Sequence, residues 1–178
     1  MSGHSKWKQI KEKKGKEDAR KSREFGKYAQ LIAVESRAAA GDVNSPNLRA
    51  VIERARAIDM PKENIERAVA RGAGAGGTTL ESITYETYGP GGVAVLIDTV
   101  TDSRNRTNQE LKHLLGTLGC APAAPGSASW AFSKEAGGSW TPKTTVPVAD
   151  EDAERLGALV EKLEEHGDVV TVTTNAEE

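Results

Sequence analysis

The sequence is poor in the residues that build disulfide, metal and catalytic sites. It contains a single cysteine, Cys120, so no disulfide can form within the chain. Its three histidines, His4, His113 and His166, are scattered, and with Cys120 they offer no ligand set at zinc spacing. No acid–base or nucleophile constellation is recognisable either. We therefore predict a protein that is not an enzyme and has no metal or cofactor.

Long apolar runs are also missing. The longest, Val93–Ile97, is far shorter than the about 20 residues that a transmembrane helix needs. No apolar segment follows the basic beginning, which argues against a secretory signal, and the acids within that beginning are atypical of a mitochondrial presequence. We expect a cytoplasmic protein without a membrane partner.

The formal net charge of −2 conceals a strong asymmetry. Residues Met1–Arg71 contain 17 basic and 10 acidic side chains, whereas the rest of the chain contains 7 basic and 16 acidic ones. Such asymmetry indicates a part that binds a polyanion, joined to a part with another role. Nucleic acid is favoured over a membrane surface, because the basic beginning has almost no apolar residues to insert.

The most basic stretch is the leader that precedes the first apolar helix pattern. Its lysines could neutralise phosphates, and Trp7 could stack on a base. A segment of this composition is expected to remain disordered until it meets nucleic acid.

Apolar residues then recur at helical spacing in three segments. The first runs from Phe25 to Gly41, the second begins after the N-cap candidate Ser45, and the third spans Met60–Gly72. Three short amphipathic helices can bury their apolar stripes only against each other, which predicts a helical domain over residues 1–71. The glycines that follow predict a flexible linker over 72–79, since the context of a phosphate-binding loop is missing.

Beyond the linker the pattern changes to that of strands and two helices. In order, it predicts strands over ITYETY and VAVLIDTV, a helix from the capping box Thr107–Glu110 to Gly119, a short strand at SASWAF, a polar connection over KEAGGSWTPK, an edge strand at TTVPV, an acidic helix over 150–166 and a strand over DVVTVTT. This order predicts a ferredoxin-like α/β sandwich over residues 80–178. The predicted fold class is therefore α+β, with an N-terminal three-helix domain and a basic leader.

Two features of this second part suggest binding surfaces. Arg104 and Arg106 lie just ahead of the predicted helix start, where free backbone N–H groups and guanidinium groups could bind phosphate. The alternative is that they are solvated or paired with Asp98 and Asp102. The acidic helix over 150–166 is either a solvated face or a surface for a protein partner.

Several longer motifs resemble one known family. They are GHSKW, MPKENIERA, YGPGGVAV, TDSRNRT and GSASWAF, and together they are similar to the YebC/PmpR family, which includes the mitochondrial translational activator of cytochrome c oxidase. The resemblance runs from Gly3 to about Phe132 and resumes near Thr141. It implies a three-helix domain followed by two α/β domains, the third inserted in the second. Because only a short connection lies near residues 133–141, we expect a short form that lacks the inserted domain.

The resemblance implies a nucleic-acid-binding regulator of gene expression. Family members are described both as DNA-binding transcriptional regulators and as factors that relieve ribosome stalling, for example at consecutive prolines. We favour a ribosome-associated translation factor, because a basic leader suits folded RNA better than a major groove. A DNA-binding regulator of a promoter and a protein-interaction module using the acidic helix remain as alternatives. The residues expected to contact RNA or DNA are His4, Ser5, Lys6, Trp7, Lys8, Lys11, Lys13, Lys14, Lys16, Arg20, Lys21, Arg23, Lys27, Arg104 and Arg106.

Overall fold

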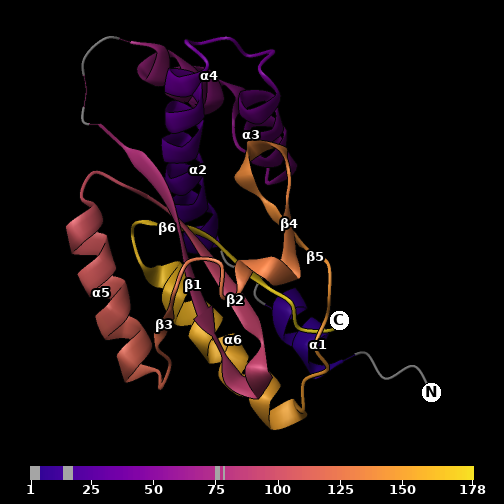
Figure 1. The fold of residues 1–178 in the computed structure, drawn as a ribbon. Coiled ribbons are helices and arrows are strands. Elements are labelled where there is room, and N and C mark those ends of the chain that lie inside the picture. Colours follow the sequence, from indigo (N-terminus) through magenta and orange to yellow (C-terminus); the bar gives the residue numbers. More distant parts are fainter. Residues whose placement is uncertain (1–4, 14–17, 75–76, 78) are drawn as a thin grey trace.

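The computed structural model describes residues 5–13, 18–74, 77 and 79–178 (Figure 1). The four helices of the first half are α1 (Lys6–Lys13), α2 (Asp18–Ala38), α3 (Pro46–Ala57) and α4 (Lys62–Ala73). The second half contains β1 (Glu81–Tyr88), η2 (Pro90–Gly92), β2 (Ala94–Thr101), α5 (Arg104–Thr117), β3 (Pro122–Ala123), η3 (Ser129–Ala131), β4 (Phe132–Lys134), η4 (Ala136–Gly138), β5 (Trp140–Pro142), α6 (Asp150–Glu165) and β6 (Val169–Thr174).

Four strands form an antiparallel sheet in the order β3-β1-β2-β6. The central strand β2 is buried along almost its whole length, as its run of β-branched and apolar residues predicts. Helices α5 and α6 pack on one face of the sheet (Figure 1). The α+β class predicted from the sequence is confirmed.

Three apolar clusters meet on β2. Val95 and Ile97 pack toward α1, α5 and α6. On the opposite face, Leu96 packs against Phe132 and its neighbours, while Val100 joins the cluster formed by α2, α3 and α4. The helical part therefore does not bury its stripes only against itself, because it also covers one end of the sheet.

The starts of α3 and α4 agree with the sequence pattern, whereas α2 begins earlier than predicted. Its polar first turns carry no apolar stripe, and Arg20 holds them against α6 through Glu164 at 2.5 Å. Helix α5 also begins earlier, at Arg104, so the predicted capping box is wrong. Thr107 is buried inside the helix, where its Oγ1 lies 2.8 Å from Thr101 Oγ1.

The segment predicted as a strand and a featureless connection forms instead a short turn and a hairpin. Ser129–Ala131 is a 3-10 turn, and the hairpin of β4 and β5 encloses η4. The hairpin reaches α3, where Arg54 donates to the Gly137 carbonyl at 2.6 Å and Gly137 N–H donates to Asn47 Oδ1 at 3.2 Å. The predicted strand at TTVPV is reduced to a single bridge between Val146 and Ala176.

The predicted linker begins too early, because Gly72 lies inside α4 and is buried against α2. A Cβ atom at this position would lie 2.3 Å from the Ala33 carbonyl oxygen and 2.7 Å from Ser36 Cβ. Glycine is therefore needed for the close approach of the two helices. Within the described ranges, no helix combines the length and the apolar character that a bilayer crossing requires.

We expect Gly72→Ala to lower the free energy of unfolding by about 1–3 kcal/mol, because α2 and α4 must move apart to admit the methyl group. The matched control is Gly116→Ala in α5, where a Cβ meets nothing within 4 Å. That change should be neutral or stabilising by up to about 1 kcal/mol. Urea unfolding of both variants tests this, and equal stabilities would contradict the close packing.

Candidate nucleic-acid interface

The described part of the basic leader before α2, residues 5–13, forms a helix that docks on the acidic helix, which corrects the expectation that this part is disordered. In α1, Trp7 is only 4% exposed and belongs to the same apolar cluster as Leu156 and Val160 of α6. Ile10 packs beside Gly157, where a Cβ would lie 2.9 Å from Ile10 Cγ2. Because the ring of Trp7 is in the core, it is not placed to stack on a base.

Ion pairs between the basic and acidic halves surround this apolar contact. Lys6 Nζ lies 3.2 Å from Glu154 Oε1, and Lys11 pairs with Glu178. Lys27 donates to the backbone carbonyl of Glu164, and its pKa is lowered by burial, although the charge of Glu164 opposes that effect. The charge asymmetry of the sequence is thus partly neutralised within the molecule.

Ser5 has a structural role at the start of the leader. Its Oγ accepts the backbone N–H of Lys8 at 3.2 Å, in the manner of a helix cap, and it lies 3.5 Å from the Glu177 carbonyl. His4, Lys14 and Lys16 are outside the described residues, as is the side chain of Lys13.

Three other lysine and arginine side chains predicted to contact nucleic acid are not paired with acids in the described structure. Lys21 and Arg23, in the first turns of α2, are exposed and form no ion pair with any described residue. Lys8, on α1, is half-buried and likewise has no described ion pair. These cations lie on α1 and in the first turns of α2, and we refer to the three together as the leader face.

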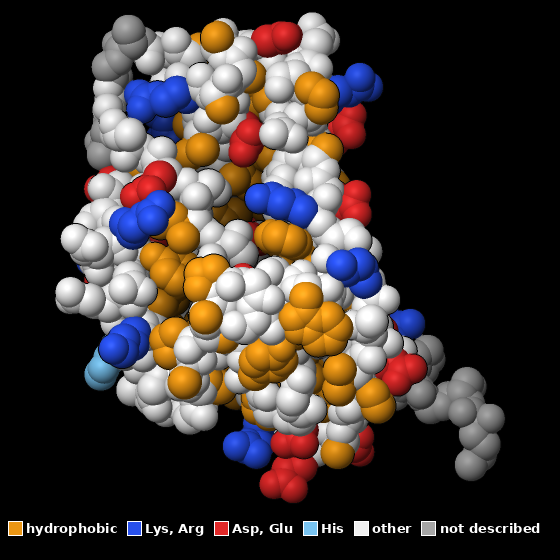
Figure 2. Space-filling view, viewed as in Figure 1, with side chains coloured by type: hydrophobic (Ala, Val, Ile, Leu, Met, Phe, Trp, Pro, Cys, Tyr) orange, Lys and Arg blue, Asp and Glu red, His pale blue; other side chains and the backbone are white. Residues whose placement is uncertain are grey.

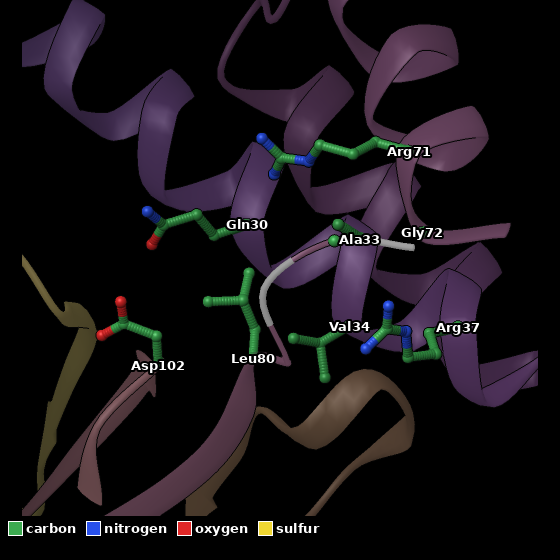
Figure 3. A pocket seen from close by; sticks show the side chains of 9 residues that line it. Gln30, Ala33, Val34, Arg37, Arg71, Gly72, Leu80 and Asp102 are labelled. Atoms are coloured by element: carbon green, nitrogen blue, oxygen red, sulfur yellow. The ribbon is translucent and has the colours of Figure 1, made fainter. Parts of the chain in front are cut away.

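A second group of basic side chains lines a hollow of about 270 Å³ between α2, α4 and the start of the sheet (Figure 3). Arg71 donates to the Ala29 carbonyl at 3.2 Å, while Arg37 has no ion-pair partner in the described part of the chain. Gln30 and Asp102 lie at the rim. Periodicity placed Arg37 and Arg71 on helices but gave no signal that α2, α4 and the start of the sheet enclose a hollow.

Arg104 and Arg106 have different environments. Arg106 is fixed by Asp102 at 2.8 Å and by Asp168 at 2.9 Å, and these hydrogen bonds, that to Asp168 first, raise its pKa. Arg104 has one exposed pair, with Glu81 at 2.9 Å. The paired alternative therefore applies to both arginines, but with Asp168 and Glu81 as additional partners and without Asp98.

Asp98 faces the hairpin instead. It accepts hydrogen bonds from Thr84 Oγ1 at 2.7 Å and from Trp140 Nε1 at 3.1 Å. Burial raises its pKa, although these hydrogen bonds oppose the rise. Asp98 therefore helps to hold β5 over the sheet.

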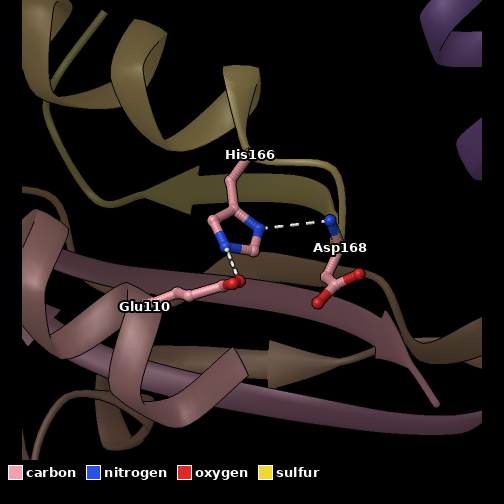
Figure 4. Close-up of side chains that lie close together, drawn as sticks. All are labelled: Glu110, His166 and Asp168. Carbon is pink, nitrogen blue, oxygen red and sulfur yellow. Dashed lines mark hydrogen bonds and ion pairs between the residues drawn. The ribbon is translucent and has the colours of Figure 1, made fainter. Parts of the chain in front are cut away.

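Glu110, His166 and Asp168 form a compact cluster where α5 meets the turn after α6 (Figure 4). His166 Nε2 lies 2.9 Å from Glu110 Oε2, and its Nδ1 accepts the backbone N–H of Asp168 at 3.1 Å. The ligand atoms lie within 4.8 Å of one another, a spacing that could hold a metal ion. Arg106, however, already supplies a positive charge to Asp168 at 2.9 Å. The arrangement fits an ion-pair network that fastens α5 to the α6–β6 turn better than a metal site.

Sequence reasoning missed one buried carboxylate, Glu86 of β1. Its oxygens accept the backbone N–H groups of Gly126 and Ala128 at 2.7 Å and of Ser129 at 2.9 Å. Burial acts to raise the pKa of Glu86, but these hydrogen bonds outweigh it and the pKa is lowered. The loop it fixes presents Trp130, which is 59% exposed. The one sequence signal for this role of Glu86 was the presence of an acidic residue inside a predicted strand.

Comparison with known proteins shows a family to which the sequence is similar. The family model described as TACO1/YebC protein N-terminal domain matches residues 5–75, and that described as TACO1/YebC second and third domain matches residues 80–137 and 133–176. A probable transcriptional regulatory protein of Thermotoga maritima is 50% identical over 137 residues, which cover 76% of this chain and 54% of the relative. Another of that name, from Petrotoga mobilis, is 44% identical over 182 residues, covering 99% and 71%.

The chain thus spans about half the length of the Thermotoga relative that it matches. Among solved structures, a conserved hypothetical protein from Aquifex aeolicus is similar, with a TM-score of 0.75 and 28% sequence identity. The match covers 90% of this chain and 91% of that one.

We expect Trp7→Ala to lower the free energy of unfolding by about 3–5 kcal/mol, because it removes a large side chain from the core beneath α1. Hydrogen exchange of the α1 amides should accelerate as the helix detaches. Trp130→Ala is the control, since Trp130 is mostly exposed and should cost less than about 1 kcal/mol. A leader that exchanges rapidly in the wild type would contradict the docked helix.

The Asp168 network predicts a pH-dependent stability. Burial acts to raise the pKa of Asp168, but hydrogen bonds from Arg106 and Thr107 hold it below its usual value. A carboxylate with a depressed pKa stabilises the fold above the pKa of the unfolded chain, about 4, and loses that effect as pH falls further.

We therefore expect Asp168→Asn to destabilise the fold by about 1 kcal/mol at pH 7, since both partners are partly exposed to screening solvent. The difference from the wild type should shrink as the pH falls below about 4. Chemical unfolding at pH 7 and pH 3 measures it, with the exposed Glu151→Gln as control. A difference that stays constant with pH would exclude the charged network.

Proposed function

This chain belongs to the TACO1/YebC family, and from that premise we propose that it is a nucleic-acid-binding regulator of gene expression. The relatives named above as probable transcriptional regulatory proteins support regulation as its role. Phosphate recognition requires lysine and arginine side chains that are free to exchange partners. The leader face, with exposed Lys21 and Arg23, meets that requirement, and it is the observation that carries the proposal.

More specifically, we propose that the leader face binds ribosomal RNA and that the protein acts on translation in the cytoplasm, for example by relieving stalled ribosomes. Two exposed cations of α3 and α4 are balanced by acids one turn away, which makes these helices less favourable readers of a DNA major groove. Arg49 pairs with Glu53 at 3.3 Å, and Lys62 with Glu66 at 3.6 Å. The cations of the leader face lie on α1 and α2 and have no described ion pair, which suits the irregular shape of folded RNA.

We also propose that this chain is a short form of the family fold. The second family model matches in two segments that meet at residues 133–137. The hairpin of β4 and β5 occupies that place and contacts α3 through Gly137. The domain division that we predicted at residues 72–79 would then begin after Ala73, where α4 ends, and separate two parts that remain packed together through Val100 and Val170.

Two alternative functions predict different binding partners. A promoter-binding regulator would use the same leader face on duplex DNA. A protein-interaction module based on α6 is less favoured, because Glu154 and Glu164 are engaged by Lys6 and Arg20.

Ribosome co-sedimentation tests the proposal. We expect the full chain to pellet with ribosomes at low salt and the variant Lys8→Ala/Lys21→Ala/Arg23→Ala to lose at least about tenfold in affinity. Each phosphate contact contributes about 0.7–0.9 to the slope of log affinity against log salt, so the variant should also show a shallower slope.

The control variant Lys143→Ala/Arg155→Ala/Lys162→Ala removes the same charge from exposed positions outside the leader face and should pellet normally. If neither the wild type nor the control pellets but the wild type binds one promoter duplex against competitor, the transcriptional alternative replaces the ribosomal one. Identical binding by the wild type and the leader variant would exclude the leader face.

A further inference from the structure

An open sheet edge lies beside α5 in the second half of the protein. Strand β1 pairs along its whole length with β2 but pairs with β3 only at Glu86 and Thr87. On that side no described strand covers Glu81–Tyr85. The uncovered edge, α5 and the Pro122–Pro125 segment enclose a groove of about 360 Å³, which we call the edge groove. Its volume lies in the range typical of small-ligand sites.

The walls of the edge groove combine apolar surface with polar and charged side chains. Ile83, Leu111, Leu115 and Pro122 provide flat or branched apolar surface. In Figure 2 apolar side chains are exposed with basic ones above and below them, on the side where α5 lies in Figure 1. A groove of this kind suits a flat ring that is apolar on its faces and polar at its rim.

One polar atom in the groove wall has no partner. Tyr85 lines the groove, and its hydroxyl is buried without a hydrogen bond to any described residue. Burial raises its pKa, so it is a hydrogen-bond donor at neutral pH. Buried polar groups are almost always satisfied, so this hydroxyl has hydrogen-bonding capacity left for a water molecule or a ligand group.

Two asparagines stand in the same groove. Asn105 and Asn108 are one turn apart on α5, which places them on one face of the helix. Asparagine amides both donate and accept, and this pattern matches the hydrogen-bonding edge of a nucleobase. Neither side chain has a hydrogen bond within the described structure.

Cations mark both ends of the groove. Arg104 and Lys112 both line it and are separated by about 12 Å along the axis of α5. Lys112 has no described ion pair, and the pair of Arg104 with Glu81 is 65% and 43% exposed, so it can exchange cheaply for a phosphate. Arg106, in contrast, is held by Asp102 and Asp168 and stays structural.

We propose that the edge groove binds an unstacked base of a single-stranded RNA, with the flanking phosphates on Arg104 and Lys112. This rests on the proposed function, to which it adds the kind of RNA that is recognised. Ile83 and Pro122 contact the faces of the base, and the two asparagines with Tyr85 contact its rim. Strand addition by a peptide is less favoured, because the open edge is short. Backbone pairing of a peptide strand would also leave the cations and the asparagine amides without a role.

The first test is a titration of the ¹⁵N-labelled full chain with AMP, CMP, GMP and UMP, and separately with inorganic phosphate, followed by NMR. We expect at least one nucleotide to shift the side-chain amide signals of Asn105 and Asn108, while phosphate alone leaves them in place. Equal shifts with phosphate would reduce the groove to an anion site and overturn the proposal. Absence of shifts with all four nucleotides would do the same.

The second test compares single-stranded and duplex RNA of equal length by fluorescence anisotropy. Asn108→Leu should weaken single-strand binding about tenfold, the order expected for loss of one bound base, and leave duplex binding unchanged. The matched control is Gln109→Leu, because Gln109 is exposed on α5 and does not line the groove. Tyr85→Phe should weaken single-strand binding a few-fold while melting no lower than the wild type, since it removes an unsatisfied group.

The outcomes separate this inference from the proposed function. In one outcome, ribosome binding is lost in the leader variant and yet is unchanged by Asn108→Leu and Tyr85→Phe. This result would exclude RNA binding in the edge groove and favour a protein strand at its open edge. Nucleotide shifts at Asn105 and Asn108 in a chain that does not bind ribosomes or promoter DNA would support the groove and remove the proposed function.

Discussion

The need to cover β2 on both faces governs the arrangement of the other elements. Its apolar residues are almost fully buried, and a strand in the centre of a small sheet cannot bury two faces by itself. Helices α5 and α6 with α1 cover one face. The hairpin and the three helices α2, α3 and α4 divide the other between them. The helical and sheet parts are thereby joined through the strand that both of them cover.

The opposite charges of the two halves follow from the same packing. Helix α1 reaches β2 only by lying against α6, and the acids of α6 lower the cost of bringing so many lysines onto one surface. Apolar burial of Trp7 holds the helix, while the exposed ion pairs set its orientation and contribute little stability. Cations that do not face α6 keep their charge free. The basic composition is therefore divided between internal neutralisation and surface available for binding.

Periodicity predicted the elements with long apolar stripes, namely α3, α4, α6, β2 and β6, because burial there follows local spacing. It failed where a distant contact determines the local structure. Trp7 was predicted to stack on a base, but its ring is buried against α6. Thr107 was predicted to cap a helix, but it lies in the core with its hydroxyl against that of Thr101. The edge groove exists because β3 is short and pairs with only two residues of β1. No local sequence pattern predicts the length of β3. Charge counts found the basic region correctly but could not show which cations were already paired.

The contact between α1 and α6 also imposes an order of events during synthesis. Helix α1 is translated before α6, so the surface that receives Trp7 and Ile10 is made only after α1 has left the ribosome. Contacts between such distant segments form late, because the intervening chain must be closed into a loop first. Throughout elongation the basic helix therefore has no docking site, and its lysines face the surroundings of the nascent chain. Completion of α6 supplies the docking surface for α1 and brings Glu154 to Lys6, while cations such as Lys8 keep their charge free.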